Sequence, residues 1–224
     1  MNELHFLIHI IIIFGFGVIA LKLGKEYLAT WVAIQTILAN LFVIKQIYFF
    51  GFNVTCSDAF AIGSILGLNF LQEYFGREIA KKALWGAFFS MIFFACMSEI
   101  HLLYSPSPYD TAHAAYQQLL APSPRLLAAS IIVFWITQQL DLRVFHFLSQ
   151  HRDRFPFWMR NAISLSLTQL IDTTLFTLLG LWGLVASLWD VITISFLLKI
   201  AIISLMTPFL ALTKRYIHPT QRGP

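Results

Sequence analysis

Residues 4–21 read LHFLIHIIIIFGFGVIAL, an apolar run between Glu3 and Lys22. A helix needs about 20 apolar residues to cross a hydrocarbon core about 30 Å thick, so this run is long enough to span a membrane. Six further stretches have the same character: Leu28–Phe50, Asp58–Phe75, Ala83–Leu103, Leu126–Leu142, Ala162–Leu184 and Leu188–Leu212. The sequence therefore predicts an all-α, polytopic membrane bundle of about seven transmembrane helices.

The composition supports a single membrane domain. Hydrophobic residues make up 58% of the chain and charged residues only 12%, with a mean hydropathy of +0.73. Soluble domains carry about 25% charged residues. Short connectors leave no room for a soluble unit, so residues 1–224 are predicted to form one integral membrane domain. The first run has neither a basic leader nor a small-residue cleavage site, so we expect a retained helix and not a signal peptide.

Basic residues mark every second connector. Lys and Arg accumulate on the cytoplasmic side of membrane proteins, which predicts an external N-terminus and a cytoplasmic C-terminus. The external connectors hold no basic residue except Arg125, at the end of the long loop 104–124. The basic connectors and the tail hold Lys22 and Lys25; Arg77, Lys81 and Lys82; Arg143, Arg152, Arg154 and Arg160; Lys214, Arg215 and Arg222. Because topology accounts for these positions, the net charge of +4 indicates no nucleic-acid surface.

Polar and ionisable side chains interrupt the apolar stretches. A charge near the bilayer centre costs at least a few kcal/mol, so such residues face the bundle interior, a partner side chain or a water-filled cavity. The candidates for a binding site are Asn40, Lys45, Asn69, Gln72, Glu73, Gln138, Gln169, Asp172 and Lys199.

Two of the stretches place polar residues on one helix face. Asn69, Gln72 and Glu73 are spaced i, i+3, i+4, and Gln169, Asp172 and Phe176 are spaced i, i+3, i+7. Two interpretations follow. The acids and lysines can form structural ion pairs, Glu73 with Lys45 or Asp172 with Lys199, or the set can line a polar pocket that holds a substrate. The amides favour the pocket, because they present donors and acceptors to a ligand. Asp58, at the start of its stretch, is interpreted only as a helix end-cap.

The chain lacks the motifs of the common enzyme classes. It contains no glycine-rich phosphate loop, and His5 and His9 have helical ligand spacing but no evident third metal ligand. Cys56 and Cys96 fit neither a disulfide framework nor a metal site. We therefore expect no catalytic residue, metal or cofactor, although an intramembrane enzyme is an alternative without positive support.

Three motifs resemble one transporter family. They are the stretch Asn40–Lys45, the stretch Gly63–Arg77 with its ending EYFGR, and the stretch Gln169–Phe176, which begins QLIDTT. Together they are similar to the queuosine precursor transporter family, also called the vitamin uptake transporter family. The residues QQLD at 138–141 and Lys199 also match. The resemblance covers about Asn40 to Tyr216, and we place the family-like core at 28–216.

The resemblance implies a multi-pass importer of 7-deazaguanine precursors of queuosine, such as queuine, in the cell inner membrane. The chain departs from the family pattern in an apparent extra N-terminal span, Leu4–Leu21, and in Asn69, where the family usually shows Asp. A carboxylate, Asp172 or Glu73, can accept both the lactam N–H and the exocyclic amine of a deazaguanine. The amides can take the remaining polar edge, and Phe176 can stack on the ring.

The bilayer and the small-molecule substrate are the partners that this interpretation requires. An energising partner and a homo-oligomer are both left open. Two rival interpretations also stay open: a transporter of another vitamin-like or nucleobase substrate, and a structural membrane protein whose ion pairs fix the helix register.

Overall fold

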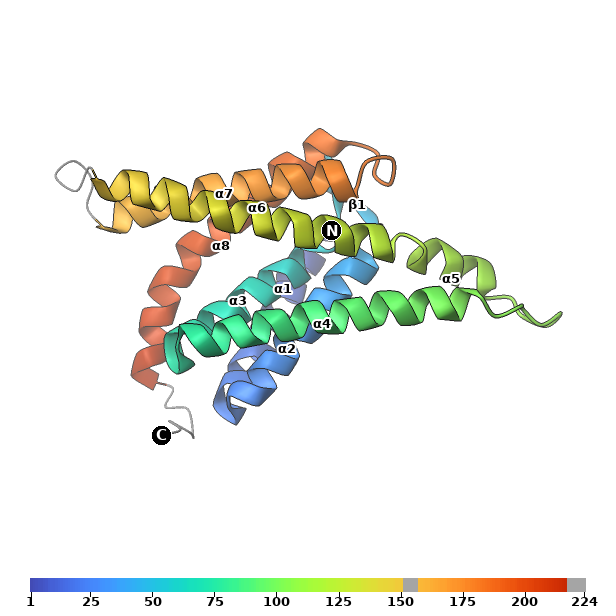
Figure 1. Cartoon of the computed structure of the whole chain (residues 1–224), viewed down its shortest axis with the longest axis horizontal. Coiled ribbons are helices and arrows are strands. Elements are labelled where there is room, and N and C mark those ends of the chain that lie inside the picture. The colour runs from blue at the N-terminus through green and yellow to red at the C-terminus, as the bar shows by residue number, and fades with distance from the viewer. Residues whose placement is uncertain (151–156, 217–224) are drawn as a thin grey trace.

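The computed structural model describes residues 1–150 and 157–216. It is mostly helical, as predicted, and Figure 1 shows the arrangement of its helices. The elements in chain order are α1 (Asn2–Leu23), α2 (Lys25–Phe42), β1 (Gln46–Phe49), β2 (Phe52–Thr55), α3 (Asp58–Phe75), α4 (Arg77–Leu102), α5 (His113–Leu120), α6 (Ser123–Gln150), α7 (Phe157–Gly180) and α8 (Leu188–Tyr216). Each predicted span therefore begins or ends within one long helix.

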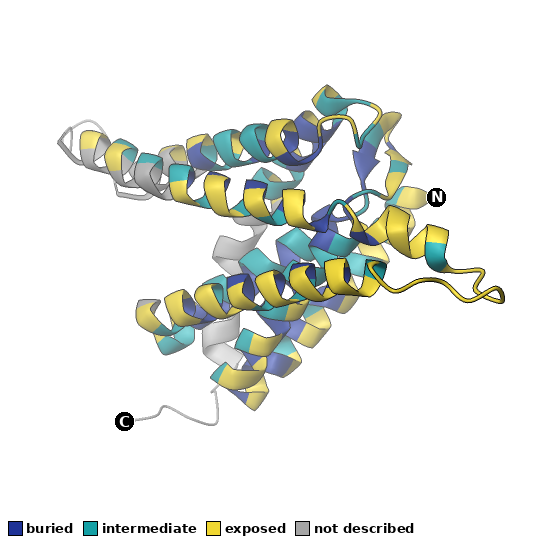
Figure 2. Ribbon diagram, turned by 45° about the vertical axis from the view of Figure 1, so that its right-hand side comes forward, coloured by how far each residue is buried: buried dark blue, intermediate teal, exposed yellow. Residues whose placement is uncertain are grey.

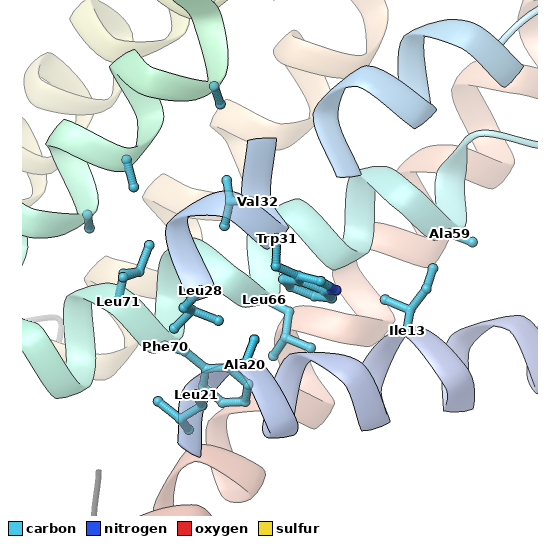
Figure 3. Packing of buried hydrophobic residues seen from close by; sticks show 13 residues of the cluster. Ile13, Ala20, Leu21, Leu28, Trp31, Val32, Ala59, Leu66, Phe70 and Leu71 are labelled. Atoms are coloured by element: carbon cyan, nitrogen blue, oxygen red, sulfur yellow. The ribbon is translucent and has the colours of Figure 1, made fainter. Parts of the chain in front are cut away.

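Helices α1, α2 and α3, with three buried alanines of α4, form the principal hydrophobic core (Figure 3). Leu21 of α1, Leu28 of α2 and Phe70 of α3 are fully buried in this cluster. Gly24, between α1 and α2, has a φ of 121°, which lets the chain reverse within one residue. The core thus joins three consecutive helices into one block, and α4 packs beside α2 and α3.

Glycines allow α3 to approach its neighbours closely. Gly63 and Gly67 are spaced i, i+4, the small-xxx-small pattern of closely packed membrane helices. A Cβ on Gly67 would overlap Cγ2 of Val32 and lie 2.9 Å from Cζ3 of Trp31. Trp31 fills the space beside Gly67 and also beside Gly17 of α1, whereas a Cβ on Gly63 would meet Ile13 and Gln35.

A second layer faces this block. Helices α6 and α7 run side by side (Figure 1), and α8 returns from them to contact α3 and β2. Figure 2 shows exposed residues along the outward faces of α4 and α6. Large apolar side chains such as Phe89, Phe93 and Trp135 are among them, which fits helices that face lipid.

The predicted span Leu28–Phe50 is wrong beyond Phe42. Helix α2 ends there, and the chain continues as an antiparallel hairpin with Gln46 opposite Thr55 and Phe49 opposite Phe52. The alternation of exposed and buried residues in QIYF has the period of a strand. Gly51, with a φ of 87°, supplies the turn conformation that a β-branched residue resists.

Hydrogen bonds attach the hairpin to the start of α1 and to the start of α8. The side-chain Nδ2 of Asn2 donates to the carbonyl oxygen of Tyr48 at 2.8 Å. The backbone N–H of Phe50 donates to the carboxylate of Glu3 at 3.0 Å. On the other side, the backbone N–H of Asn53 donates to Asp190 at 2.8 Å. These bonds hold the hairpin across the end of the bundle where α1 begins and α8 begins.

Three segments of the described chain are long and apolar enough to cross a membrane by length and composition: Asn2–Leu23, Glu78–Leu102 and His113–Thr137. The third includes α5, a short helix that the sequence analysis placed in a loop. Helix α3 has 18 residues, but Asn69, Gln72 and Glu73 near its end lower its mean hydropathy.

We predict that Gly67→Ala destabilises the protein by about 1–3 kcal/mol, because the new methyl group overpacks the contact with Val32. The matched control is Gly86→Ala on α4, where nothing lies within 4 Å of the new Cβ. Thermal melting in detergent measures both. The control should keep or raise the melting temperature, because alanine favours a helix over glycine. An equal response of the two variants would contradict the proposed close contact.

Candidate functional site

A hollow of about 450 Å³ lies between the two layers of helices. Helices α2, α3 and α4 line one side, and α6, α7 and α8 line the other. Thr55, the last residue of β2, and Ser57, two residues later, line the hollow at the hairpin end. Small-molecule sites commonly have volumes of about 300–1,000 Å³, so this space suits an organic ligand of modest size.

Two amides in the hollow have unpartnered polar atoms. Nδ2 of Asn40 and Oε1 of Gln169 are both buried, and neither has a hydrogen-bond partner among residues 1–150 and 157–216. Asn40 itself is only 7% exposed. Buried polar atoms are nearly always paired in folded proteins, and each exception calls for an explanation such as a water, an ion or a ligand. Together these atoms offer one donor and one acceptor from opposite sides of the hollow.

An ion pair lies beside the amides. Nζ of Lys199 on α8 donates to Oδ2 of Asp172 on α7 at 2.7 Å and to Oγ1 of Thr173 at 3.0 Å. The side chain of Lys199 is 13% exposed and that of Asp172 is 32% exposed. The predicted pair is therefore present, and both of its residues line the hollow. The ion pair can therefore stabilise the fold and also form part of a substrate site.

Hydroxyl groups line much of the remaining surface, and several are turned toward their own helices. Oγ1 of Thr137 donates to the carbonyl oxygen of Val133 at 2.9 Å, and Oγ1 of Thr36 donates to that of Val32 at 2.9 Å. This back-bonding satisfies the hydroxyl protons. Each hydroxyl oxygen keeps a lone pair for a ligand donor.

Asp58 is a lining residue that the sequence analysis missed. Its interpretation as an end-cap is wrong, because α3 has no side-chain cap hydrogen bond and the carboxylate is buried at 8% exposure. Oδ2 of Asp58 instead accepts a hydrogen bond from Oγ of Ser195 on α8 at 2.9 Å. The sequence carried one signal for this role: Ser195 precedes Lys199 by four residues and shares its helix face.

The structure brings together five of the predicted residues and places four others outside the hollow. Those that line the hollow are Asn40, Gln169, Asp172, Phe176 and Lys199.

The other predicted residues lie elsewhere. Lys45 is exposed where the hairpin begins, Asn69 is half-buried, and Gln72 and Glu73 are exposed near the end of α3. None of these four lines the hollow. The side chain of Gln138 falls outside the described part of the chain.

The predicted pair of Glu73 with Lys45 is wrong. Glu73 lies 15 residues beyond Asp58 on α3, whereas the backbone of Lys45 accepts a hydrogen bond from Cys56 at the other end of that helix. At 1.5 Å per residue the two are separated by roughly 20 Å. A role in substrate binding for the four residues outside the hollow stays a prediction.

Comparison with known proteins identifies the family. A family model described as "Putative vitamin uptake transporter" matches residues 55–213. The "Probable queuosine precursor transporter" of Bacillus subtilis (strain 168) is 30% identical over 226 residues, covering 98% of this chain and 94% of that protein. The chain belongs to the queuosine precursor transporter family.

This assignment confirms the resemblance seen in the sequence and, with the apolar helices, makes the chain a membrane protein. The family is named for transport and not for catalysis. No solved structure matches the chain.

We predict that Lys199→Met lowers the thermal stability, because it leaves the carboxylate of Asp172 without its cation in a partly buried site. Losing a charge-assisted hydrogen bond costs about 1–3 kcal/mol. The double variant Asp172→Asn/Lys199→Met should recover most of this loss, since no charge is then left unpaired. Melting curves in detergent measure the effect, and exposed Lys82→Met is the control. A single variant as stable as the wild type would show that the pair adds no stability.

Proposed function

We propose that this protein imports 7-deazaguanine precursors of queuosine, such as queuine, and that the hollow between α2, α3 and α4 and α6, α7 and α8 is the substrate site. The observation that carries the proposal is the pair of unpartnered amide atoms, Nδ2 of Asn40 and Oε1 of Gln169. The family and the relative's name supply the substrate class.

A 7-deazaguanine has the polar pattern that the hollow complements. Its lactam oxygen accepts a hydrogen bond, which Nδ2 of Asn40 can donate. Its lactam N–H and exocyclic amine are parallel donors, and α7 carries two acceptors on one face of the hollow, the carboxylate of Asp172 and Oε1 of Gln169. Carboxylate and amide oxygens accept such donors.

The flat ring needs an apolar surface as well. Phe176 lies one helical turn from Asp172 on α7 and lines the same hollow, so it is our candidate for stacking on the heterocycle. Base–aromatic stacking contributes about 1–3 kcal/mol per base in other nucleobase sites. Such a site discriminates against a wrong ligand by leaving buried polar groups unpaired.

We further propose that residues 1–224 act as one transporter domain in the cell inner membrane, with the seven long helices as spans, an external N-terminus and a cytoplasmic C-terminus. The alternation of basic connectors supports this orientation. It places the hairpin and the turn 181–187 on the outer side, so the substrate would enter from the hairpin end.

A structural membrane protein is the second candidate, and the Asp172–Lys199 pair favours it. The position of the unpartnered amides opposes it. Asn40 and Gln169 line one hollow, whereas the other buried atoms without a described partner, on Gln35, Tyr74 and Ser123, lie outside it. A transporter of another nucleobase differs only in its substrate, and uptake measurements separate the two.

Uptake of radiolabelled queuine in cells that lack their own importer tests the function directly. We expect uptake with the wild-type chain and none with Asp172→Asn, whose amide oxygen still accepts a bond from Lys199. The double variant Asp172→Asn/Lys199→Met leaves no unpaired charge, so it should also lose uptake while keeping the protein at its normal membrane level. Guanine uptake without queuine uptake would reject the substrate class. A loss of protein that matches the loss of uptake would favour the structural interpretation.

We predict that Asn40→Leu keeps or raises the melting temperature of the ligand-free protein, because it replaces an unsatisfied buried amide with an apolar side chain of similar size. The same substitution should abolish the rise in melting temperature that queuine causes in the wild-type protein. Loss of stability without ligand would show that Asn40 serves the fold and not the substrate.

A further inference from the structure

Asp58 is the charged group in the hollow that the proposed recognition of the deazaguanine ring does not use. Its carboxylate lines the hollow, is buried, and accepts a hydrogen bond from Ser195 at 2.9 Å. Ser195 is itself only 4% exposed. A buried carboxylate whose hydrogen bond comes from a neutral hydroxyl is costly, and the nearby cation, Lys199, is already bonded to Asp172.

The described side chains of the hollow carry an excess of negative charge. The ionisable ones among them are Asp58, Asp172 and Lys199. Lys199 is held by Asp172 and Thr173, at 2.7 and 3.0 Å. One lysine balances one carboxylate, so the hollow lacks one positive charge when both acids are ionised.

Helix α8 sets the distance between the two carboxylates. Ser195 holds Asp58 and Lys199 holds Asp172, and these partners are four residues apart on one face of α8. Four residues of helix correspond to about 6 Å along its axis. The acids therefore lie at two levels, with Asp58 at the level of the hairpin. Phe176 is on the hairpin side of Asp172, because α7 leads toward the turn at 181–187.

This arrangement matches a ligand with a flat head and a charged arm. A ring over Phe176 with its lactam edge at Asp172 directs the opposite edge toward Asp58. The unpartnered Nδ2 of Asn40, which is nine-tenths buried in the same hollow, independently indicates that a ligand completes this site.

We propose that Asp58, oriented by Ser195, is a specificity subsite for a protonated amine on the 7-substituent of the substrate. This inference rests on the proposed function and refines it: the transporter prefers 7-deazaguanines with a cationic side arm over those with a neutral one. An ammonium group supplies the missing charge and donates to the carboxylate, and charge-assisted hydrogen bonds of this kind are the strong ones.

Uptake of two probes that share the ring tests the subsite. One is 7-aminomethyl-7-deazaguanine, which carries an ammonium group, and the other is 7-cyano-7-deazaguanine, which is neutral. In wild-type protein reconstituted into liposomes we expect the amine to be favoured about tenfold or more in initial rate at subsaturating concentration. In Asp58→Asn the ratio should fall to about one, through loss of amine uptake with cyano uptake retained.

Two further variants sharpen the result. Ser195→Ala leaves the carboxylate but removes its orienting hydroxyl, so it should reduce the ratio by less than Asp58→Asn does. Glu99→Gln removes an exposed acid of α4 outside the hollow and should leave the ratio at the wild-type value. The ratio is informative because a merely structural defect lowers both rates together.

The outcomes separate the subsite from the transport function. Wild-type uptake of both probes at equal rates overturns the subsite and leaves the proposed function standing. Equal loss of both rates in Asp58→Asn, with the protein present at its wild-type level, also overturns the subsite, because an acid that carries a proton or supports the fold serves both probes alike. Uptake of neither probe by the wild-type protein contradicts the proposed function itself.

Discussion

A bilayer offers no water to a buried carboxylate, amide or ammonium group, and this constraint organises the interior of the protein. The polar residues of α2, α3, α7 and α8 that line the hollow avoid lipid by turning toward one another. In doing so they hold the two layers of helices around a shared hollow. The bond from Lys199 to Asp172 joins α7 to α8, and the bond from Ser195 to Asp58 joins α8 to α3. Helix α8 therefore has polar bonds to both layers, which also meet where α4 packs against α6.

The packing of the first layer makes this arrangement stable enough to leave some polar atoms unpartnered. Close contact between α2 and α3 at Gly67 and burial of Leu21, Leu28 and Phe70 supply an apolar block that needs no ligand. The hollow lies beside this block, where α3 turns its other face. One face of α3 therefore packs in the apolar core, and another lines the hollow. Because the core stabilises the fold, the amides of the hollow can remain without partners until a substrate binds.

The sequence analysis was most accurate where a pattern was local. The shared face of Gln169, Asp172 and Phe176 and the long helices follow from spacing along single helices. Opposite charge allowed either Asp172–Lys199 or Glu73–Lys45 as an ion pair, and the structure contains the first. It failed where the outcome depended on neighbours. Asp58 looks like a helix cap in the sequence, and only the approach of Ser195 from α8 turns it inward. The end of α2 was missed because residues 46–50 are as apolar as a span, while their pairing with 52–55 makes them strands.

The amino-acid sequence alone determined three properties of the protein. It forms apolar helices, basic residues occur in every second connector, and polar side chains recur at helical spacing. These properties depend on residues within a few turns of one another. The tertiary structure decided which polar residues share the hollow: it gathered Asn40, Asp58 and Gln169 and left Lys45, Gln72 and Glu73 outside. The physical reason is that a helix face becomes a wall of a cavity only through the helices that pack across from it, and that choice rests on contacts between residues more than 100 positions apart.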